Sequence, residues 1–232
     1  YWSSNTRGLL IGSPANPTGA VYSNQELNEL FLFIEANSGF LLVDEVYQGI
    51  TFDPLDWSTA LNVSSEIFII NSFSKLFGMT GWRLGWLVVP EIACSDLLKL
   101  SQNFFICAPS IAQHAALAAF NDETQAIVKG QADTLSKRKD FLVQALRDIG
   151  FRVDAPPSGA YYVYAKLPEN SIRSEEFCRK LLEKELVSTT PGTDFGENSS
   201  QDFVRFSFTQ SLSVLKIALE RIARFLENST ET

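Results

Sequence analysis

The sequence contains little cysteine and almost no histidine, which limits the metal and redox chemistry open to it. Its 232 residues include three cysteines, Cys94, Cys107 and Cys178, and a single histidine, His114. An odd number of cysteines without paired spacing gives no disulfide framework, so we expect reduced thiols in the core of a cytoplasmic protein. One histidine without a cysteine cluster supplies too few ligands for a zinc site. Cys107 and His114 are therefore interpreted as core or helix-face residues.

Positive charge is also scarce, and long apolar runs are absent. Nineteen lysines and arginines stand against 27 acidic residues, which gives a formal net charge of −8 without any basic tract. This balance argues against a nucleic-acid partner for this segment. No apolar run approaches the roughly 20 residues of a membrane span, and no signal-like N-terminus is present. Hydrophobic residues make up 45% of the chain, enough for one large core or two modest ones.

Short apolar runs in the first ninety residues predict strands. Residues 9–12 are apolar, and the stiff turn SPANPTG follows at 13–19. Ser23 and Glu26 form a capping box before apolar residues at helical spacing, and we expect Gly39 to close that helix. Strands that alternate with a helix predict a mostly parallel α/β sheet. Three further apolar runs lack alternation, as is typical of strands covered on both faces, namely residues 40–43, 67–70 and 86–89.

The pattern changes after about residue 109 and predicts a smaller α+β domain. Residues 122–148 form a long amphipathic pattern that ends at Gly150, with Lys137, Arg138 and Lys139 on its solvent side. The other expected elements are a helix at 111–120, a strand at 161–164, a helix at 173–185, a strand at 203–208 and a helix at 211–227. The predicted divisions are a first domain over 1–121, a bridging helix over 122–150 and a small domain over 151–232.

Polar side chains follow the apolar strands of the predicted sheet. Open α/β sheets bind ligands at the carboxyl ends of their strands, so these side chains are expected at one edge. A carboxylate, a phenol and an amine that converge there suit a cofactor with a ring nitrogen, a ring oxygen and an aldehyde. Hydroxyls and an arginine suit a phosphate, and pyridoxal 5′-phosphate has all four features. The residues are Asn16 after the first run, Asp44 and Tyr47 after the second, Ser72, Ser74 and Lys75 after the third, and Arg83 shortly beyond.

Taken singly, each of these residues has an ordinary structural explanation. Asp44 could cap a strand end with Tyr47 packed beneath it, and Lys75 could be a solvated loop lysine. Ser72 and Ser74 are also common turn residues. Their joint occurrence in one order favours the functional interpretation over independent coincidence.

Three motifs in this region carry a family resemblance. SPANPTG at 13–19, DEVY at 44–47 and SFSKLFGMTGWRLG at 72–85 resemble the class I and II aminotransferases of fold type I. The resemblance covers essentially the whole chain. It implies that residues 1–121 are the C-terminal half of a large cofactor domain. A start at Tyr1, without methionine, also leads us to expect a piece of a longer protein.

The resemblance implies roles for the residues at the sheet edge. Lys75 would form a Schiff base with pyridoxal 5′-phosphate and move the proton of the substrate's α carbon. Asp44 would pair with the pyridine nitrogen, which makes the ring an electron sink. Asn16 and Tyr47 would bind the ring oxygen, and Asn16 would also approach the substrate. The phosphate would be held by Ser72, Ser74 and Arg83.

The resemblance extends into the small domain. FVRFSFTQS at 203–211 resembles the segment in which an arginine, here Arg205, binds the substrate's α-carboxylate through two parallel hydrogen bonds. TPGTDFG at 190–196 resembles a loop that precedes this strand in many members. Strand alternation places Phe203, Arg205 and Ser207 on one face, and a solvent-facing Arg205 is the competing interpretation.

The implied activity is transfer of an amino group between an amino acid and a 2-oxo acid, by a protein that is a homodimer at full length. The family segments that stack on the cofactor ring and reach into the partner site precede SPANPTG, so we expect weak cofactor binding and little turnover by this chain alone. Two alternatives stay open. One is the transaminase-like domain of a transcription regulator, which senses pyridoxal phosphate without turnover. The other is a carbon–sulfur lyase or acyl-condensing synthase, which Tyr47 disfavours because those relatives commonly carry histidine there.

Overall fold

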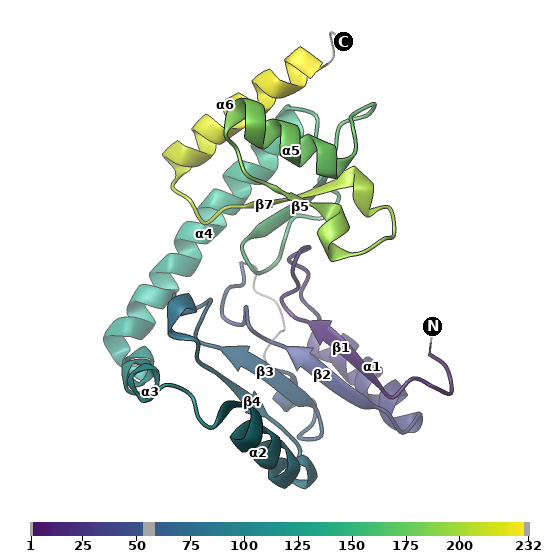
Figure 1. Cartoon of the computed structure of the whole chain (residues 1–232), viewed down its shortest axis with the longest axis vertical. Helices are drawn as coiled ribbons and strands as arrows, with labels where there is room; N and C mark the ends of the chain where they lie inside the picture. Colours follow the sequence, from purple (N-terminus) through teal and green to yellow (C-terminus); the bar gives the residue numbers. More distant parts are fainter. Residues whose placement is uncertain (1, 53–58, 230–232) are drawn as a thin grey trace. The chain divides into compact units, whose positions relative to one another are not determined.

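A computed structural model describes residues 2–52 and 59–229 of the chain (Figure 1). The chain forms two compact units, and each is described by itself. The first unit contains the described residues up to Ala15 together with Ala20–Ala132, and the second contains Asn16–Gly19 and Asp133 onward. The short segment Asn16–Gly19 therefore belongs to a different unit from the residues on either side of it.

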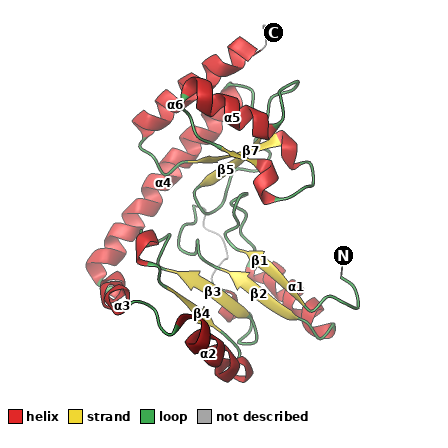
Figure 2. Cartoon of the chain, viewed as in Figure 1, coloured by secondary structure: helices red, strands yellow, loops and turns green. Residues whose placement is uncertain are grey.

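The first unit is built on a four-stranded sheet with helices around it (Figure 2). The strand order is β1-β2-β3-β4, with β1, β2 and β3 parallel and β4 antiparallel to β3. This arrangement confirms the predicted α/β class with a mostly parallel sheet. The strands are β1 (Gly8–Gly12), β2 (Phe40–Asp44), β3 (Phe68–Ser72) and β4 (Gly85–Val88). The helices are α1 (Asn24–Ala36), α2 (Glu91–Phe105), α3 (Ser110–Leu117) and the start of α4 (Asp122–Asp148), with 3₁₀ turns η1 (Ala60–Asn62), η2 (Thr80–Trp82) and η3 (Ala118–Phe120).

Helix α1 begins as its sequence predicts and ends differently. The Ser23 hydroxyl accepts from the Glu26 backbone N–H, and the Glu26 carboxylate accepts from the Ser23 backbone N–H, so the capping box is confirmed. The expectation that Gly39 closes the helix is wrong, because Ser38 takes the left-handed conformation, with φ of 54°. Gly39 instead donates to the Ile34 carbonyl at 3.0 Å. A Cβ on Gly39 would lie 2.7 Å from the Trp2 ring, so glycine is needed here for close approach.

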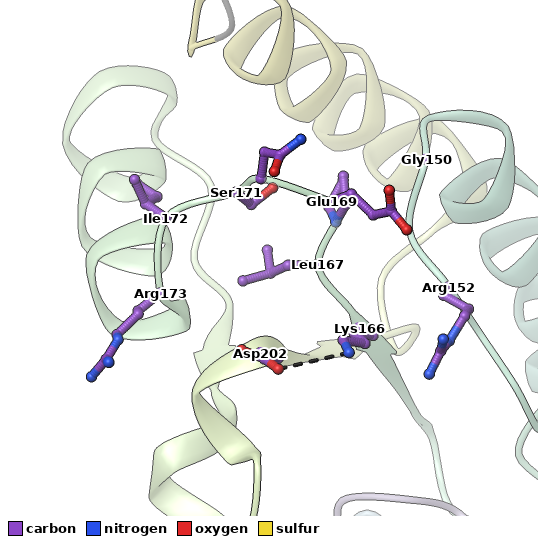
Figure 3. A pocket seen from close by; sticks show the side chains of 11 residues that line it. Gly150, Arg152, Lys166, Leu167, Glu169, Ser171, Ile172, Arg173 and Asp202 are labelled. Carbon is purple, nitrogen blue, oxygen red and sulfur yellow. Dashed lines mark ion pairs between the residues drawn. The ribbon is translucent and has the colours of Figure 1, made fainter.

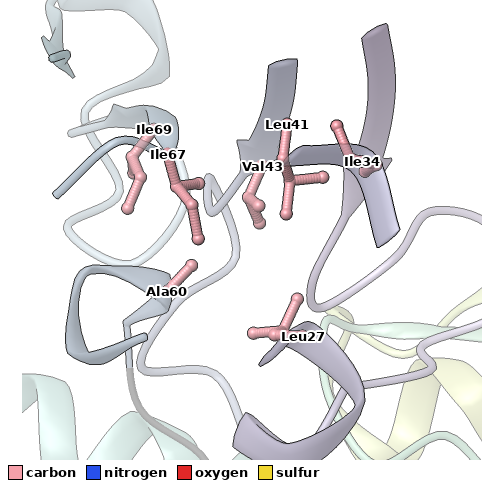
Figure 4. Packing of buried hydrophobic residues seen from close by; sticks show 7 residues of the cluster. All are labelled: Leu27, Ile34, Leu41, Val43, Ala60, Ile67 and Ile69. Carbon is pink, nitrogen blue, oxygen red and sulfur yellow. The ribbon is translucent and has the colours of Figure 1, made fainter. Parts of the chain in front are cut away.

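The core of the first unit lies between α1 and one face of the sheet. Leu27 and Ile34 of α1 meet alternate residues of β2 and β3 (Figure 4). Each fully buried aliphatic side chain of this kind contributes about 1.5–3 kcal/mol of hydrophobic stabilisation. The buried cluster comprises Leu27, Ile34, Leu41, Val43, Ala60, Ile67 and Ile69.

The opposite face of the sheet is largely exposed. Leu10, Phe40 and Leu87 expose 66%, 49% and 56% of their surface. The prediction that these strands are covered on both faces is therefore wrong for the described residues. Continuous apolar runs predicted burial on two sides, whereas the strands alternate between a packed and an open face.

Helix α2 is an element that the sequence patterns did not predict. None of its residues is buried, and Ile92, Phe104 and Phe105 are among its exposed apolar side chains. The apolar side chains of α2 do not pack into the core of the first unit. The sequence therefore showed no apolar stripe that would have predicted a helix packed on that core. A groove of about 660 Å³ lies between α2 and the β3–β4 side of the sheet. Cys94, which lines the groove, and Cys107 are both exposed, so the expectation of core cysteines holds only for Cys178.

The second unit packs helices on a three-stranded antiparallel sheet of order β5-β7-β6. Its central strand, β7, pairs Arg205 with Tyr164 on one side and with Thr190 on the other. The strands are β5 (Tyr162–Lys166), β6 (Thr190–Pro191) and β7 (Phe203–Ser207), the helices α5 (Ser174–Glu185) and α6 (Leu212–Ser229), and the 3₁₀ turns η4 (Gly192–Phe195) and η5 (Ser200–Asp202). The core side chains include Phe177, Leu181, Phe206, Phe208, Ile222 and Phe225.

Helix α4 (Asp122–Asp148) has the bounds that its periodicity predicts, and Gly150 follows it with φ of 97°. Lys139 is a correction, because only 7% of its surface is exposed although its charge indicated a solvent-facing position. Its ammonium lies 3.3 Å from the exposed Asp140 carboxylate, so the buried stem ends in a paired charge. No helix within the described ranges is long and apolar enough to cross a membrane.

Candidate active site

The carboxyl end of β2 positions Asp44 and Tyr47. Asp44 is the last residue of the strand, and its backbone pairs with Gly12 of β1 and Ile70 of β3. Its carboxylate Oδ1 accepts from the Val46 backbone N–H at 3.0 Å, which orients the carboxylate beyond the strand end. Tyr47 follows in the turn and is buried. A strand end flanked by two parallel neighbours thus holds a half-buried carboxylate beside a buried phenol.

The loop after β3 places two hydroxyls against each other. Ser72 Oγ lies 2.9 Å from Ser74 Oγ and 3.1 Å from the Leu84 carbonyl, and it accepts from the Ser74 backbone N–H at 3.1 Å. Thr80 Oγ1 donates to the Ser74 carbonyl at 2.7 Å, which fixes the next turn of the loop. A Cβ on Gly85 would lie 2.7 Å from the Asn71 carbonyl, so glycine permits this close pairing of β3 and β4.

Lys75 and Arg83 occupy the same loop. Lys75 is half-buried, and its Nζ lies 5.6 Å from the centroid of the Tyr47 ring. Arg83 is exposed, has φ of 55°, and its Nη1 donates to the Thr80 carbonyl at 3.0 Å. The structure therefore brings the lysine to the tyrosine, whereas the arginine folds back on its own loop.

These residues match the functional groups of pyridoxal 5′-phosphate. The parallel strands β2 and β3 end at the same edge of the sheet, so Asp44, Tyr47 and Lys75 all follow that edge. A carboxylate can hold the pyridinium nitrogen, a phenol can bind the ring oxygen, and a primary amine can react with the aldehyde. Ser72 and Ser74 supply hydroxyl donors for a phosphate. No group of three metal-ligating side chains occurs in the part of the chain that the structure describes.

A second cluster of functional groups surrounds Arg205 in the second unit. Nη1 of Arg205 donates to Oδ1 of Asn16 at 2.7 Å, and Nη2 donates to Oγ1 of Thr190 at 3.1 Å. Asn16 comes from the SPANPTG turn, in which the peptide bonds before both prolines are cis. The Gly19 carbonyl accepts from the backbone N–H groups of Ser158 and Gly159, so backbone hydrogen bonds tie this turn to the second unit.

Sequence reasoning missed the groups that hold Arg205. Thr190 and Phe195 lie in the motif TPGTDFG, which was noted only for its resemblance, and Tyr162 was assigned only to a strand. Cross-strand pairing was the available signal, because Thr190 lies directly opposite Arg205. Among these groups Phe195 is the least predictable, since it comes from a 3₁₀ turn rather than from a strand.

Glu45 is a buried carboxyl that the motif DEVY also did not single out. Only 2% of its surface is exposed, and its Oε1 accepts from the Ala60 backbone N–H at 2.7 Å. Burial raises the pKa of this carboxyl above its ordinary value, and hydrogen bonds from Ala60 and Thr59 partly oppose that shift. Glu45, the residue that follows Asp44, thus links the end of β2 to η1.

A separate pocket of about 630 Å³ in the second unit contains none of the predicted site residues (Figure 3). Two of the three cations that line it are paired with acidic side chains. Lys166 Nζ lies 3.7 Å from Asp202, and Arg152 Nε lies 2.9 Å from Asp154. These neutralised cations offer little net attraction to an anionic ligand, so the sheet edge and Arg205 are the stronger candidates.

Comparison with known proteins decides the family. The family model described as "Aminotransferase class I and II" matches residues 3–222 of the chain. The chain belongs to this family. Members of the family use pyridoxal 5′-phosphate, in agreement with the groups at the sheet edge.

The chain is 39% identical to the valine–pyruvate aminotransferase of Mycobacterium tuberculosis, over 95% of the chain and 57% of the relative. It is 35% identical to the (5-formylfuran-3-yl)methyl phosphate transaminase of Methanocaldococcus jannaschii, over 97% of the chain and 59% of the relative. The crystal structure of an aminotransferase from Mycobacterium tuberculosis matches it with a TM-score of 0.91 at 39% identity, over 96% of this chain and 58% of that one. The chain thus spans 57–59% of the length of these relatives.

Proposed function

We propose that the whole protein uses pyridoxal 5′-phosphate to transfer an amino group between an amino acid and a 2-oxo acid. The observation that carries this proposal is the meeting of Lys75 and Tyr47 beyond the parallel strands that also deliver Asp44. A partly buried amine beside a buried phenol and near a carboxylate is suited to proton transfer at a bound substrate. Family membership supports the same assignment.

Each candidate cofactor-binding residue has a proposed task. The cofactor, when bound, supplies an electron sink for the charge that develops at the substrate's α carbon. Asp44 keeps the cofactor's ring nitrogen protonated, and Tyr47 and Asn16 donate hydrogen bonds toward its ring oxygen. The phosphate is held by Ser72, Ser74 and Arg83, which requires the Arg83 side chain to leave the Thr80 carbonyl. Lys75 removes and returns the proton at the α carbon.

Arg205 is the proposed receptor for the substrate's α-carboxylate. Within residues 2–52 and 59–229, its side-chain hydrogen bonds go to the neutral oxygens of Asn16 and Thr190. A planar guanidinium with free in-plane N–H groups binds a carboxylate through two parallel hydrogen bonds. Asn16 would then serve both the cofactor and the substrate.

The substrate is proposed only as a class. The two relatives are named for different substrates, valine with pyruvate in one case and a furan aldehyde phosphate in the other. We further propose that the whole protein is a homodimer. Exposed apolar side chains on α2, including Ile92, Phe104 and Phe105, support an association surface.

The test combines cofactor loading with product analysis. The whole protein is incubated with pyridoxal phosphate and a panel of amino acids, and the absorbance of the cofactor and the formation of 2-oxo acid are followed. Conversion to the amine form of the cofactor, reversed by a 2-oxo acid, supports transamination. Cofactor binding without turnover would instead indicate a sensor. Release of ammonia and pyruvate from cysteine-type substrates would indicate a lyase.

A further inference from the structure

Arg205 is a partly buried cation that neutral groups hold. It lies on the central strand β7, and its side chain donates to an amide oxygen and a hydroxyl oxygen. Within residues 2–52 and 59–229, no carboxylate forms an ion pair with it, whereas Arg224 pairs with Glu185 and Arg179 with Glu183. A partly desolvated charge without a counter-ion is costly unless another group stabilises it.

Two aromatic rings supply that stabilisation. The Arg205 Cζ lies 4.2 Å from the centroid of the Tyr162 ring and 4.7 Å from that of Phe195. Tyr162 is buried at 8% exposure on β5, and Phe195 contacts the edge of Tyr164, with centroids 6.2 Å apart at 88°. A guanidinium that stacks on an aromatic ring keeps its N–H groups available to a ligand, because those groups lie in its plane.

The turn that carries Phe195 is constrained by its own sequence. A Cβ on Gly192 would lie 2.2 Å from the Ser200 carbonyl and 2.8 Å from that of Phe203, so only glycine fits. Thr193 Oγ1 also hydrogen-bonds to Glu175 Oε1 at 2.9 Å, which links η4 to the first turn of α5. The ring of Phe195 is therefore delivered to Arg205 by a fixed turn.

Arg205 has N–H donors that remain available to a ligand. A guanidinium has five N–H groups, and one on each terminal nitrogen is used by Asn16 and Thr190. The remaining N–H groups lie in the guanidinium plane. A carboxylate that approaches in this plane can be bound through two hydrogen bonds, without displacing either neutral acceptor.

We propose that Phe195, together with Tyr162, is a positioning residue that sets the plane of the Arg205 guanidinium for the substrate's α-carboxylate. This inference rests on the proposed function of Arg205. It assigns substrate affinity to an aromatic side chain that acts through the arginine. Because the same contact is made before and after the chemical step, it affects binding rather than the rate of chemistry.

The experiment compares three variants of the whole protein. Phe195→Leu removes the ring face, and Phe195→Tyr keeps it. Phe203→Leu removes a ring that stacks on Tyr164, with centroids 4.9 Å apart, and that is not among the described rings in contact with the Arg205 guanidinium. We expect F195L to raise KM for the amino acid by about five- to thirtyfold, with kcat changed less than about twofold. F195Y should restore KM, and F203L should leave it near wild type.

A carboxylate-free substrate separates positioning from general disruption. L-Valine, L-alanine and L-phenylalanine are compared with isobutylamine, ethylamine and phenethylamine, which lack the α-carboxylate. F195L should weaken use of the amino acids and leave use of the amines unchanged. An equal loss for both sets, or an unchanged KM for the amino acids, would overturn the inference while the proposed function stands.

Calorimetric titration with pyruvate tests the inference when no amino acid is turned over, a result that would by itself remove the proposed function. Weaker pyruvate binding by F195L, restored in F195Y, would still support the positioning role. Equal binding by wild type and F195L, or no binding by either, would overturn it.

Discussion

Arg205 and Asn16 lie 189 positions apart in the chain and are joined by a 2.7 Å hydrogen bond from Nη1 to Oδ1. The acceptor is an uncharged amide oxygen, so it orients the guanidinium and leaves its charge for a ligand. A carboxylate at the same position would orient the guanidinium equally well but would also neutralise it. The choice of asparagine at this position is therefore a testable part of the proposed substrate site.

Asn16→Asp should impair substrate binding more than Asn16→Ala does. N16A removes one charge-assisted hydrogen bond, and we expect KM for the amino acid to rise by about 10-fold, equivalent to about 1.4 kcal/mol. N16D supplies a competing carboxylate, so KM should rise further, and the increase should shrink at high salt. Steady-state kinetics at two ionic strengths measures both. An N16D variant with lower KM than N16A would contradict a free Arg205 charge, and cofactor affinity is measured in parallel because Asn16 is also assigned to the ring oxygen.

Lys75 should be the lysine that bonds to the cofactor. Borohydride reduction of the whole protein loaded with pyridoxal phosphate should leave the pyridoxyl group on Lys75, as read by peptide mapping. Lys75→Arg keeps the positive charge but removes the primary amine, and should lower kcat about 10²–10⁴-fold. Lys99→Arg, in the exposed part of α2, is the matched control and should be silent. A label on Lys99 would contradict the assignment.

Asp44→Asn separates the proposed charge role from the structural role of Asp44. Asparagine retains an oxygen for the Val46 N–H, which the carboxylate accepts at 3.0 Å, so unfolding free energy should change by less than about 0.5 kcal/mol. Loss of the negative charge opposite the pyridinium should lower kcat/KM by about 10²–10³-fold. Asp44→Ala should lose activity and about 1 kcal/mol of stability as well. Thermal unfolding and steady-state kinetics of both variants separate the charge role of Asp44 from its structural role. Near-normal activity of D44N would contradict the proposed ion pair between Asp44 and the pyridinium.

Local signals allowed much of the fold to be predicted from sequence. The capping box of Ser23 and Glu26 and the bounds of α4 depend on neighbours within a few residues, and both follow their patterns. The exposed face of the sheet and helix α2 were not predicted, because an apolar run in the sequence does not show which other element, if any, covers it. Gly39 illustrates the same limit, since its requirement comes from the distant Trp2 ring.

The candidate site also contains residues that could be predicted from the sequence and contacts that could not. Asp44 and Lys75 were predictable because strand ends of a parallel sheet share an edge, a rule that needs only the strand positions. The contact between Asn16 and Arg205 was not predictable from the residues, because nothing local links positions so far apart. The role of Phe195 was also not predictable, because the side-chain periodicity of strands and long helices does not apply to a short 3₁₀ turn.

Glu45 should make the stability of the protein depend on pH. Burial raises its pKa above the ordinary value of 4.5, so the folded state binds the proton more tightly than the unfolded state. Between about 4.5 and the raised pKa, the folded state holds more protons, and the free energy of unfolding falls as pH rises through this window. Its contribution is fully present below about pH 4.5 and is lost above the folded pKa.

Glu45→Gln should remove this dependence while keeping an oxygen acceptor for the Ala60 N–H, which Glu45 binds at 2.7 Å. Urea unfolding of wild type and E45Q at several pH values between 4 and 8 measures the difference, in which the shared carboxylates cancel. We expect E45Q to gain stability relative to wild type as pH rises. Glu66→Gln, which removes an exposed carboxylate, is the matched control. Glu45→Ala should cost about 1–3 kcal/mol at the low end of this pH range, because the Ala60 N–H loses its partner, and the cost should fall as pH rises because the titrating carboxyl is also removed. A loss of stability of E45Q relative to wild type as pH rises would mean that hydrogen bonding, rather than burial, governs this carboxyl.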